Sequence, residues 1–537
     1  MLASVTVAEA VADQLADVGV DKVFGLPGGE VLALIEALRR RGIDYVVCRH
    51  EADAGIVAGV YGRLTQRVGV VLTTLGPGAC NLMLPLASSL LDREPLIAIS
   101  AQIPDTWSVE RTHQRLPLAE CFRPITKMTG SINALNCRSL VARAARIAMM
   151  HPQGPTFLSL SAEDGSQRAQ DQTTRPASDA RAVAGGQAAA ASAGAAALTT
   201  LLERAQSPIV VVGIGTRPEV STALREWLHR WRLPVAVTPK SKGIIDEGSS
   251  YFVGVVGGMA LDAMMVKALR RSDCIIGFGL DPAEIDGAWH TELPVTWILE
   301  SPWATGAVPR QGLIGTDHEA LLAQLATRPP RRWESGFEDV RERRAELLSQ
   351  NWAAGKVVPP LQLVEVLNRV LPNNTVVTTD VGAHKYLFGQ FWTSHTPKTF
   401  LMSNGLSGMG YGIPAAIAAK LADATTPVLA VVGDGAFSMN SQELETAVRV
   451  GARFVTVVLT DNSYTLIQLS QRKQGMDRYG VDFSHIDAVK TAEACGVAAI
   501  RSADPTEIAE VVVRAFSSDK SLLVEVPIDA ELYREII

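Results

Sequence analysis

Hydrophobic positions along the chain switch between two spacings, and the switch repeats through residues 6–165. Short runs of consecutive apolar residues are separated by segments of helix length in which apolar residues recur three or four positions apart. Consecutive apolar residues are typical of strands buried on both faces of a parallel sheet, because helices cover both sides. The runs lie at Val23–Leu26, Tyr45–Cys48, Val68–Thr73 and Leu96–Ser100. This first block therefore predicts a parallel sheet with helices on either face.

The same pattern returns twice more along the chain. Residues 166–200 interrupt it with Gln, Ser, Pro and Asp and then an Ala/Gly tract, which has little apolar bulk to bury and predicts a linker leading into a helix. A second block starts at Pro208, and a charged segment from Arg331 to Arg344 precedes the third block. We predict an α/β architecture of three doubly wound parallel-sheet domains, at residues 1–165, 201–330 and 355–537.

Composition and charge restrict the class of partner. The chain has 537 residues, of which 47% are hydrophobic and 20% charged, and its net charge is -6, so it carries no basic field for nucleic acid or anionic membranes. The first residues lack the basic and long apolar stretches of a signal peptide, and no run reaches the roughly 18 apolar residues of a membrane helix. We therefore expect a cytoplasmic protein that binds neither nucleic acid nor membrane.

The strongest chemical signal lies in the third block, where Gly433-Asp434-Gly435 is followed by Asp461-Asn462. A strand that ends at Gly433 places Asp434 at the carboxyl edge of the sheet, where ligands bind in open α/β sheets. Gly435 lets the backbone approach a phosphate closely, and the next helix offers its N-terminal amides to the anion. About 25 residues complete that helix and the adjacent strand, which places Asn462 at the same edge. The strands of this block are predicted at Thr375–Thr379, Val428–Val432, Phe454–Leu459 and Leu522–Val526.

Oxygen ligands at this edge predict a Mg²⁺ site. Asp434, the amide oxygen of Asn462, a backbone carbonyl at Tyr464, two phosphate oxygens and a water would make the six-oxygen shell that Mg²⁺ prefers. The alternative interpretation is a strand-end aspartate in an ordinary tight turn. The spacing to Asp461-Asn462 favours the metal site.

Gly-Asp-Gly followed after about 25 residues by Asn resembles the signature of thiamine-diphosphate enzymes. In the first block, the segment from His50 through Glu51 to Gly55 resembles the catalytic-glutamate segment of the same family. The resemblance implies that Glu51 begins a helix and hydrogen-bonds N1′ of the cofactor's aminopyrimidine. Taken alone, Glu51 also fits a glutamate that the helix dipole favours at a helix N-terminus.

Other segments resemble this family in the order in which they occur. Thr74–Asn81 resembles a loop of the pyrimidine-binding domain, and Asp380–His384 a segment that touches the diphosphate. Ser403–Gly410 resembles the stretch whose large apolar residue wedges between the cofactor rings, in this chain Met409, which alternatively fills core space. The three domains are then pyrimidine-binding, central and diphosphate-binding. The implied cofactor-binding residues are Gly28, Pro77, Asn81, Gly382, Ala383, His384, Gly408, Met409, Gly433, Asp434, Gly435, Ala436, Asn462 and Tyr464, and the implied metal ligands are Asp434, Asn462 and Tyr464.

Within the family, three segments resemble the catabolic, FAD-independent acetolactate synthases: residues 111–127, 271–284 and 463–487. The resemblance implies thiamine diphosphate and Mg²⁺ as cofactors, and FAD is not expected. Gly213-Ile214-Gly215 is a degenerate dinucleotide fingerprint and is more typical of a plain strand-to-helix turn.

His113 and Gln114 are implied to be catalytic together with Glu51. By the resemblance both face the reaction centre, where His113 relays protons or holds a carbonyl and Gln114 donates to an acceptor oxygen. The alternative is that both are polar residues satisfied in an interdomain loop.

Some positions depart from the catabolic synthases. Glu30 follows Pro27-Gly28-Gly29 where those enzymes show a lysine, and a carboxylate there would weaken binding of a 2-oxo acid unless it points away or is protonated. Leu406–Met409 is closer to the anabolic synthases. The chain ends at Ile537, soon after the last predicted strand, so a C-terminal lid is expected to be short or missing.

We therefore expect decarboxylation of a 2-oxo acid, pyruvate first among them, with carboligation to a second carbonyl compound. The resemblance implies a homodimer or homotetramer with active sites at the subunit interface. The alternatives are a 2-oxo-acid decarboxylase, or a carboligase with a different donor and acceptor in secondary metabolism. A non-catalytic paralogue and a nucleotide- or FAD-binding oxidoreductase are more distant alternatives.

Overall fold

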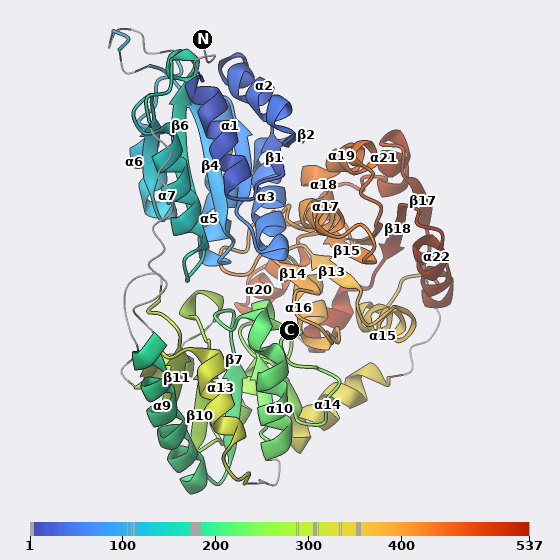
Figure 1. Cartoon of the computed structure of the whole chain (residues 1–537). Coiled ribbons are helices and arrows are strands. Elements are labelled where there is room, and N and C mark those ends of the chain that lie inside the picture. Colours follow the sequence, from blue (N-terminus) through green and yellow to red (C-terminus); the bar gives the residue numbers. More distant parts are fainter. Residues whose placement is uncertain are drawn as a thin grey trace. The chain divides into compact units, whose positions relative to one another are not determined.

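The strands of the protein form three six-stranded sheets, shown with their flanking helices in Figure 1. The computed structural model describes residues 5–104, 106–108, 110, 113–171, 184–285, 287, 289–303, 309, 311–331, 333, 336–350 and 356–535. In all three sheets, adjacent strands run parallel. The predicted architecture of three parallel α/β sheets is confirmed. The domain boundaries stay a prediction.

The first sheet has the strand order β2-β1-β3-β4-β6-β5. All residues of β3 are buried, because helices cover both of its faces. The strands are β1 (Lys22–Gly25), β2 (Asp44–Val47), β3 (Gly69–Thr73), β4 (Leu96–Gln102), β5 (Thr129–Ile132) and β6 (Pro155–Ser161). The helices are α1 (Val7–Asp17), α2 (Leu32–Arg41), α3 (Glu51–Thr65), α4 (Pro77–Cys80), α5 (Met83–Leu91), α6 (Leu118–Phe122), α7 (Cys137–Met149) and α8 (Ala162–Ser166).

The second sheet has the order β12-β11-β10-β7-β8-β9. Part of the predicted linker is helical, since α9 begins at Ala184, and residues 172–183 lie outside the described residues. The strands are β7 (Pro208–Val212), β8 (Val235–Val237), β9 (Phe252–Val255), β10 (Cys274–Phe278), β11 (Val295–Leu299) and β12 (Gly312–Ile314). The helices are α9 (Ala184–Arg204), α10 (Ser221–Trp231), α11 (Asp262–Leu269), α12 (Trp289–Glu292), α13 (His318–Ala326) and α14 (Glu338–Leu348).

The third sheet has the order β14-β13-β15-β16-β18-β17. The chain leaves β13 toward β14 on one side and continues from β15 to β16 on the other, so the strand order reverses between β13 and β15. The strands are β13 (Val376–Thr379), β14 (Phe400–Met402), β15 (Val428–Gly433), β16 (Val455–Thr460), β17 (Ala498–Arg501) and β18 (Leu522–Pro527). The helices are α15 (Pro360–Val370), α16 (Ala383–Phe391), α17 (Gly412–Ala422), α18 (Asp434–Asn440), α19 (Glu443–Val450), α20 (Thr465–Lys473), α21 (Ala488–Ala494) and α22 (Pro505–Ser517).

The chain divides into two compact units that do not follow the order of the sequence. The first unit comprises residues 1–177, 406–425 and 440–453, and the second comprises 178–405, 426–439 and 454–537. Helices α17 and α19 therefore belong with the first sheet, although they come from the third block of the sequence. Within the first unit, α17 packs against α3.

Helix α3 lies against β3 with backbone atoms in contact. A Cβ atom at Gly69 would lie 1.9 Å from the carbonyl oxygen of Ala58, and one at Gly62 would lie 2.6 Å from the amide nitrogen of Gly69. Only glycine fits at such a close approach of two backbones. The helix that begins at Glu51 is thus held against the sheet without space for a shift.

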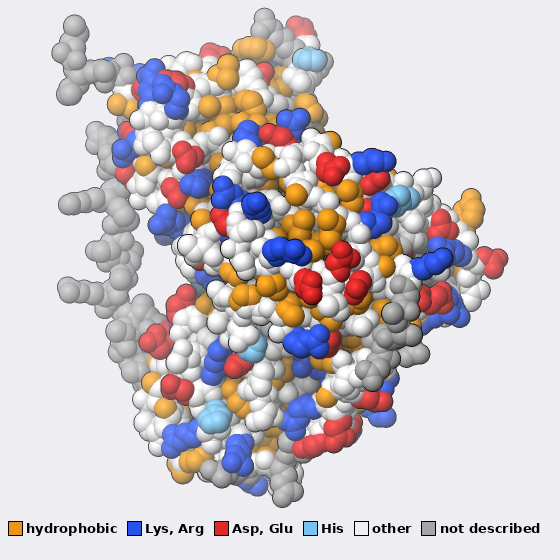
Figure 2. All heavy atoms as spheres, turned by 90° about the vertical axis from the view of Figure 1, so that its right-hand side faces the viewer, with side chains coloured by type: hydrophobic (Ala, Val, Ile, Leu, Met, Phe, Trp, Pro, Cys, Tyr) orange, Lys and Arg blue, Asp and Glu red, His pale blue; other side chains and the backbone are white. Residues whose placement is uncertain are grey.

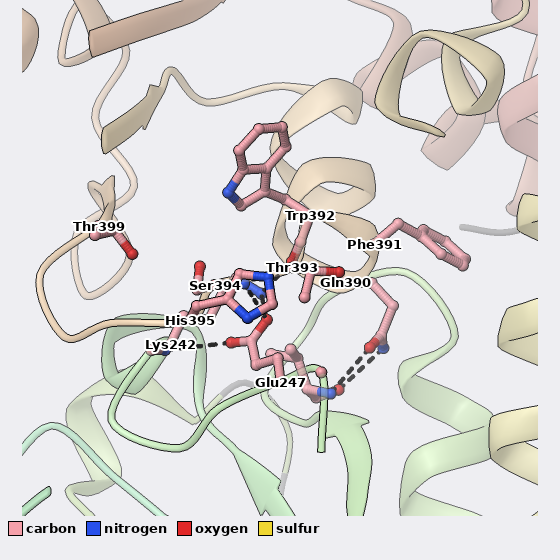
Figure 3. Close-up of polar contacts among 12 residues, drawn as sticks. Lys242, Glu247, Gln390, Phe391, Trp392, Thr393, Ser394, His395 and Thr399 are labelled. Atoms are coloured by element: carbon pink, nitrogen blue, oxygen red, sulfur yellow. Dashed lines mark hydrogen bonds and ion pairs between the residues drawn. The ribbon is translucent and has the colours of Figure 1, made fainter. Parts of the chain in front are cut away.

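In the second unit, a buried ion pair joins the second sheet to the third. Nζ of Lys242 lies 2.6 Å from Oε2 of Glu247, and both side chains are fully buried (Figure 3). Lys242 also donates to the carbonyl of Trp392 at 2.8 Å, and Glu247 accepts from the amide of Ser394 at 3.0 Å. Burial lowers the pKa of Lys242, and the adjacent Glu247 carboxylate opposes that shift. The pair stays in place because hydrogen bonds satisfy its polar atoms.

Charges of both signs are interspersed on the face shown in Figure 2, with hydrophobic side chains among them. None of the helices in the described part of the chain combines the length and the apolar character needed to cross a bilayer.

Candidate active site

The strand order of the third sheet reverses between β13 and β15, which is where an open α/β sheet forms its binding crevice at the carboxyl edge. Ligands bind in open α/β sheets at such a point, where the strand order reverses and the following loops diverge. Strand β13 leads into Gly382 and Ala383 at the start of α16, and β15 leads directly into α18. The sequence-predicted residues Gly382 to His384 and Gly433 to Ala436 therefore follow the two strands that border this crevice.

Asp434 is a buried carboxylate at the end of β15. Its Oδ1 accepts from the amide of Gly435 at 2.8 Å, and its Oδ2 accepts from the amides of Asn462 at 2.7 Å and Asp461 at 3.2 Å. Burial raises the pKa of Asp434 to about 6, and the charge of Asp461 adds to the increase while the three amides oppose it. A carboxylate in this environment gains stability from a nearby cation.

The side chain of Asn462 provides an oxygen that suits such a cation. Asn462 has a left-handed backbone with φ of 58°, and its Oδ1 is buried without a hydrogen-bond partner among the described residues. A buried polar atom without a partner is costly, so an oxygen of this kind is suited to bind a ligand. The described residues contain no cluster of three or more His, Cys, Asp or Glu that could hold a metal. A Mg²⁺ ion at Asp434 and Asn462 would therefore take its other oxygens from phosphate, water and backbone, as Mg²⁺ commonly does.

Tyr464 contributes a backbone carbonyl and an aromatic ring next to this edge. Its carbonyl oxygen accepts from the amides of Ile467 at 2.9 Å and Gln468 at 3.1 Å, so a bond to a metal has to replace one of these hydrogen bonds. A Cβ at Gly435 would lie 2.8 Å from Cε1 of Tyr464. The absence of a side chain at Gly435 thus makes room for this ring.

His384 lies between Gly382, which follows β13, and Gly433, the last residue of β15. A Cβ at Gly382 would lie 2.7 Å from its Cε1, and a Cβ at Gly433 would lie 3.1 Å from the same atom. Burial lowers the pKa of His384 to about 4, so the ring is neutral near pH 7. Its Nε2 is buried without a hydrogen-bond partner among the described residues. The ring nitrogen is therefore a polar atom that can bind a ligand in the crevice.

Glu51 lies at the carboxyl edge of the first sheet, where α3 begins. His50 caps the helix, because its Nδ1 accepts from the amide of Ala52 at 3.1 Å. Oε2 of the half-buried Glu51 accepts from Nδ2 of Asn81 at 2.8 Å. A Cβ at Gly78 would lie 3.4 Å from Oε1 of Glu51, so the loop with Pro77 and Asn81 packs directly on this carboxylate.

Two further predicted residues lie beside this loop. Gly76 has a φ of 57°, and a Cβ there would lie 3.2 Å from Cβ of Gln114. Gln114 itself has a φ of 58° and is exposed, as is His113 in the same turn. Arg111 and Thr112 lie outside the described residues. The structure thus brings Gln114 against the loop that contacts Glu51.

Glu30 also points to this loop. Its Oε2 accepts from Oγ1 of Thr74 at 2.7 Å, and a Cβ at Gly28 would lie 2.5 Å from the same hydroxyl oxygen. Thr74 in turn packs on Gly78, since a Cβ there would lie 2.9 Å from its Cγ2. Thr74, which the sequence analysis named only as the start of the segment Thr74–Asn81, therefore connects Glu30 with the surroundings of Glu51.

Residues 406–410 of the candidate wedge segment belong to the first unit as well. Met409 is half-buried, and a Cβ at the neighbouring Gly408 would lie 2.9 Å from Cδ1 of Leu84 on α5. The predicted site residues thus form two groups in different compact units. The first unit contains Gly28, Glu51, Pro77, Asn81, His113, Gln114, Gly408 and Met409, and the second contains Gly382 to His384, Gly433 to Ala436, Asn462 and Tyr464.

Comparison with known proteins finds relatives along nearly the whole chain. The N-terminal TPP binding domain of the thiamine pyrophosphate enzymes matches residues 5–119, their central domain residues 195–297, and their C-terminal TPP binding domain residues 380–526. The acetolactate synthase of Bacillus subtilis (strain 168) is 32% identical over 97% of this chain and 93% of its own length. The catabolic acetolactate synthase of Raoultella terrigena is 29% identical over 97% and 95%, and the acetolactate synthase isozyme 2 large subunit of Escherichia coli (strain K12) is 27% identical over 95% and 93%. The chain therefore belongs to the thiamine pyrophosphate enzyme family, as a thiamine-diphosphate-dependent enzyme of the acetolactate synthase type.

Proposed function

We propose that the protein decarboxylates pyruvate with thiamine diphosphate and Mg²⁺ and joins the remaining two-carbon unit to a second carbonyl compound, which is pyruvate in the simplest case. Two pyruvate ions and one proton then give one acetolactate ion and one CO₂, without an external oxidant or reductant. The observation that carries the proposal is the pair formed by the buried Asp434 carboxylate and the unpartnered Oδ1 of Asn462. The acetolactate synthases among the relatives support the choice of substrate.

The residues have distinct roles in this proposal. Asp434, Asn462 and the carbonyl of Tyr464 hold Mg²⁺, and His384 and the backbone after Gly433 hold the diphosphate. Glu51, oriented by Asn81, exchanges a proton with the aminopyrimidine, and Gln114 donates to the acceptor oxygen. When bound, thiamine diphosphate supplies a carbon nucleophile and takes up the electron pair released with CO₂. The proposed active unit is a homodimer or homotetramer with its sites at the subunit interface.

The test uses the purified full-length protein with thiamine diphosphate, Mg²⁺ and saturating pyruvate. The expected products are CO₂ and acetolactate in equal amounts, measured after a single incubation. The Glu51→Gln variant should lose turnover by at least about 100-fold, because its amide cannot exchange the proton. Glu120→Gln, a surface change, serves as the matched control. Absence of acetolactate from wild-type enzyme, or full turnover by Glu51→Gln, would refute the proposal.

The contact of Glu30 with Thr74 favours a second candidate function, carboligation to an acceptor that has no carboxylate. A carboxylate this near the loop that contacts Glu51 repels an anionic acceptor, whereas it tolerates a neutral aldehyde. Glu30→Lys is therefore expected to raise kcat/KM for pyruvate as acceptor, relative to an aldehyde, by about tenfold, or roughly 1.4 kcal/mol. Glu30→Gln, which retains an acceptor for Thr74, separates the effect of charge from that of shape. An unchanged acceptor preference in both variants rules this candidate out.

The central sheet supports a protein without FAD. After β7, the amide of Ile214 donates to Oε1 of Glu284 at 2.7 Å, and a Cβ at Gly213 would lie 2.9 Å from the same oxygen. The side chain of Glu284 is buried and takes the place beside the turn that a dinucleotide phosphate would need. The purified protein is expected to show no flavin absorption in the visible spectrum at about 450 nm.

A further inference from the structure

Glu443 is a fully buried carboxylate on α19 whose contacts lie just before Glu51. Its Oε1 accepts from the amide of Arg49 at 2.7 Å and from the amide of His50 at 3.1 Å. Its Oε2 is buried without a hydrogen-bond partner among the described residues. The hydrogen-bonded oxygen of Glu443, Oε1, therefore contacts the turn between β2 and α3. It bonds to the backbone of the two residues that precede Glu51.

The same helix holds this turn at a second point. Nη2 of Arg449 donates to the carbonyl of Val47 at 2.5 Å, so α19 contacts both the end of β2 and the start of α3. Leu444 and Ala447 bury the inner face of α19. The turn that carries Glu51 is thus fixed on one side by the sheet and on the other by a helix that comes from a distant part of the sequence.

We infer that Glu443 is a positioning residue that fixes the backbone from which the Glu51 side chain reaches its proton partner. The inference rests on the proposed function, since Glu51 is the proton-transfer group there. Hydrogen bonds to an ionised carboxylate are about twice as strong as neutral ones, so the charge of Glu443 gives the turn its stiffness. A catalytic group must keep its place within a fraction of an ångström, because displacement by about 1 Å can cost on the order of 100-fold in rate.

Three variants of the full-length protein test the inference. Glu443→Ala removes both hydrogen bonds, and Glu443→Gln keeps an acceptor oxygen but removes the charge. Glu120→Gln is the matched control, because Glu120 is an exposed carboxylate on α6 of the same compact unit. Each variant is compared with wild type by hydrogen–deuterium exchange of residues 45–55 in the cofactor-free protein, by thiamine diphosphate affinity, and by steady-state kinetics with pyruvate.

For Glu443→Ala we expect faster exchange in residues 45–55 and a loss in kcat of about 100-fold. For Glu443→Gln we expect a smaller loss in kcat, of about tenfold, because one acceptor remains. In both variants thiamine diphosphate affinity and the KM for pyruvate should stay within about threefold of wild type, since the change acts on the reacting step. Glu120→Gln should match wild type in every measurement.

The inference is overturned if Glu443→Ala exchanges like wild type in residues 45–55, or if its kcat is unchanged. If the alanine variant does not fold, the near-isosteric Glu443→Gln takes its place. Wild-type exchange in residues 45–55, or an unchanged kcat, in that variant then overturns the inference. Failure of the proposed function looks different. Wild-type protein would then turn over no pyruvate, while the exchange measurement would still report whether Glu443 fixes the turn.

Discussion

At the scale of single residues, Asp434 combines burial with three hydrogen bonds from backbone amides. The amides orient the carboxylate, yet they do not compensate for its lost hydration, because the pKa is raised to about 6. The Mg²⁺ ion proposed for this site would supply the missing stabilisation, and the open Oδ1 of Asn462 could bind the same ion. The orientation of Asp434 and its need for a counter-charge thus have separate structural causes.

Replacing Asp434 by Asn should weaken Mg²⁺-dependent binding of thiamine diphosphate by at least about 100-fold, because the ion loses its charged ligand. Isothermal titration calorimetry of the cofactor in the presence of Mg²⁺ measures the loss. Wild-type protein in EDTA should behave like the variant. Asp477→Asn, at an exposed position in the same sheet region, should bind like wild type. Equal affinities for Asp434→Asn and wild type would remove Asp434 from the metal site.

His384 makes the stability of the protein depend on pH in the acidic range. Its pKa is lowered to about 4 in the folded protein, against about 6.5 in an unfolded chain. The unfolded state therefore takes up the proton first as the pH falls. The stability is fully present above pH 6.5 and is lost between 6.5 and 4, by up to about 3 kcal/mol from this group.

Urea unfolding at several pH values between about 4 and 7.5 measures this dependence. In His384→Gln the stability should change less steeply between pH 6.5 and 4 than in wild type, whatever its value at neutral pH. His229→Gln serves as the control, because His229 is exposed on α10. A variant curve parallel to wild type would mean that His384 is not the group that takes up the proton.

At the scale of elements, the pair of Lys242 and Glu247 connects the turn after β8 with the end of α16. Removing one partner leaves a buried charge, so Lys242→Met is expected to lower the free energy of unfolding by about 3–5 kcal/mol. In the double variant Lys242→Met/Glu247→Gln neither charge of the pair remains, and the glutamine oxygen can still accept from the amide of Ser394. Most of the loss should therefore be recovered. Denaturation followed by tryptophan fluorescence makes the comparison, and a double variant as unstable as the single one would contradict it.

Several strands at the edges of the sheets cannot be predicted from the local hydrophobic pattern of the sequence. The sequence indicates buried apolar strands such as β3 and β15, although it did not predict the fully buried β6. It does not indicate β5, β14 and β17, which lie at the edges of their sheets and have only three or four residues each. The residues of β17 are at least partly exposed, so they lack an apolar run. Such strands form because a neighbouring strand offers unpaired backbone groups, which is a property of the sheet.

At the scale of the whole molecule, the proposed dimer places Glu51 of one subunit with Asp434 of another. A mixture of Glu51→Gln and Asp434→Asn subunits, dissociated and re-associated together, tests this arrangement. About half of the dimers should be mixed, each with one intact site, which gives about a quarter of wild-type activity. If each site forms within one subunit, the mixture has no intact site and stays inactive. Each variant re-associated alone is the control.

The sequence by itself determined the family and the thiamine diphosphate dependence of this protein. At each site residue a strand is followed directly by a turn and a helix. The spacing of Asp434 and Asn462 therefore predicted that both lie at one sheet edge. The resemblance to the family predicted the role of Glu51. The three parallel sheets were predicted from the alternation of apolar runs with segments that have helical spacing of apolar residues. Sequence order, however, assigns α17 and α19 to the third block, whereas the structure groups them with the first sheet.

Only the tertiary structure decides which groups support these residues. Thr74 lies 44 positions from Glu30, and Glu443 lies 394 positions from Arg49, yet hydrogen bonds join each pair. Contacts between positions so far apart leave no local pattern in the sequence. They depend on how helices pack against sheets, which only the folded chain determines. The unpartnered Oδ1 of Asn462 also depends on the tertiary structure. Whether a buried atom has a hydrogen-bond partner is decided by all the groups that the fold places around it.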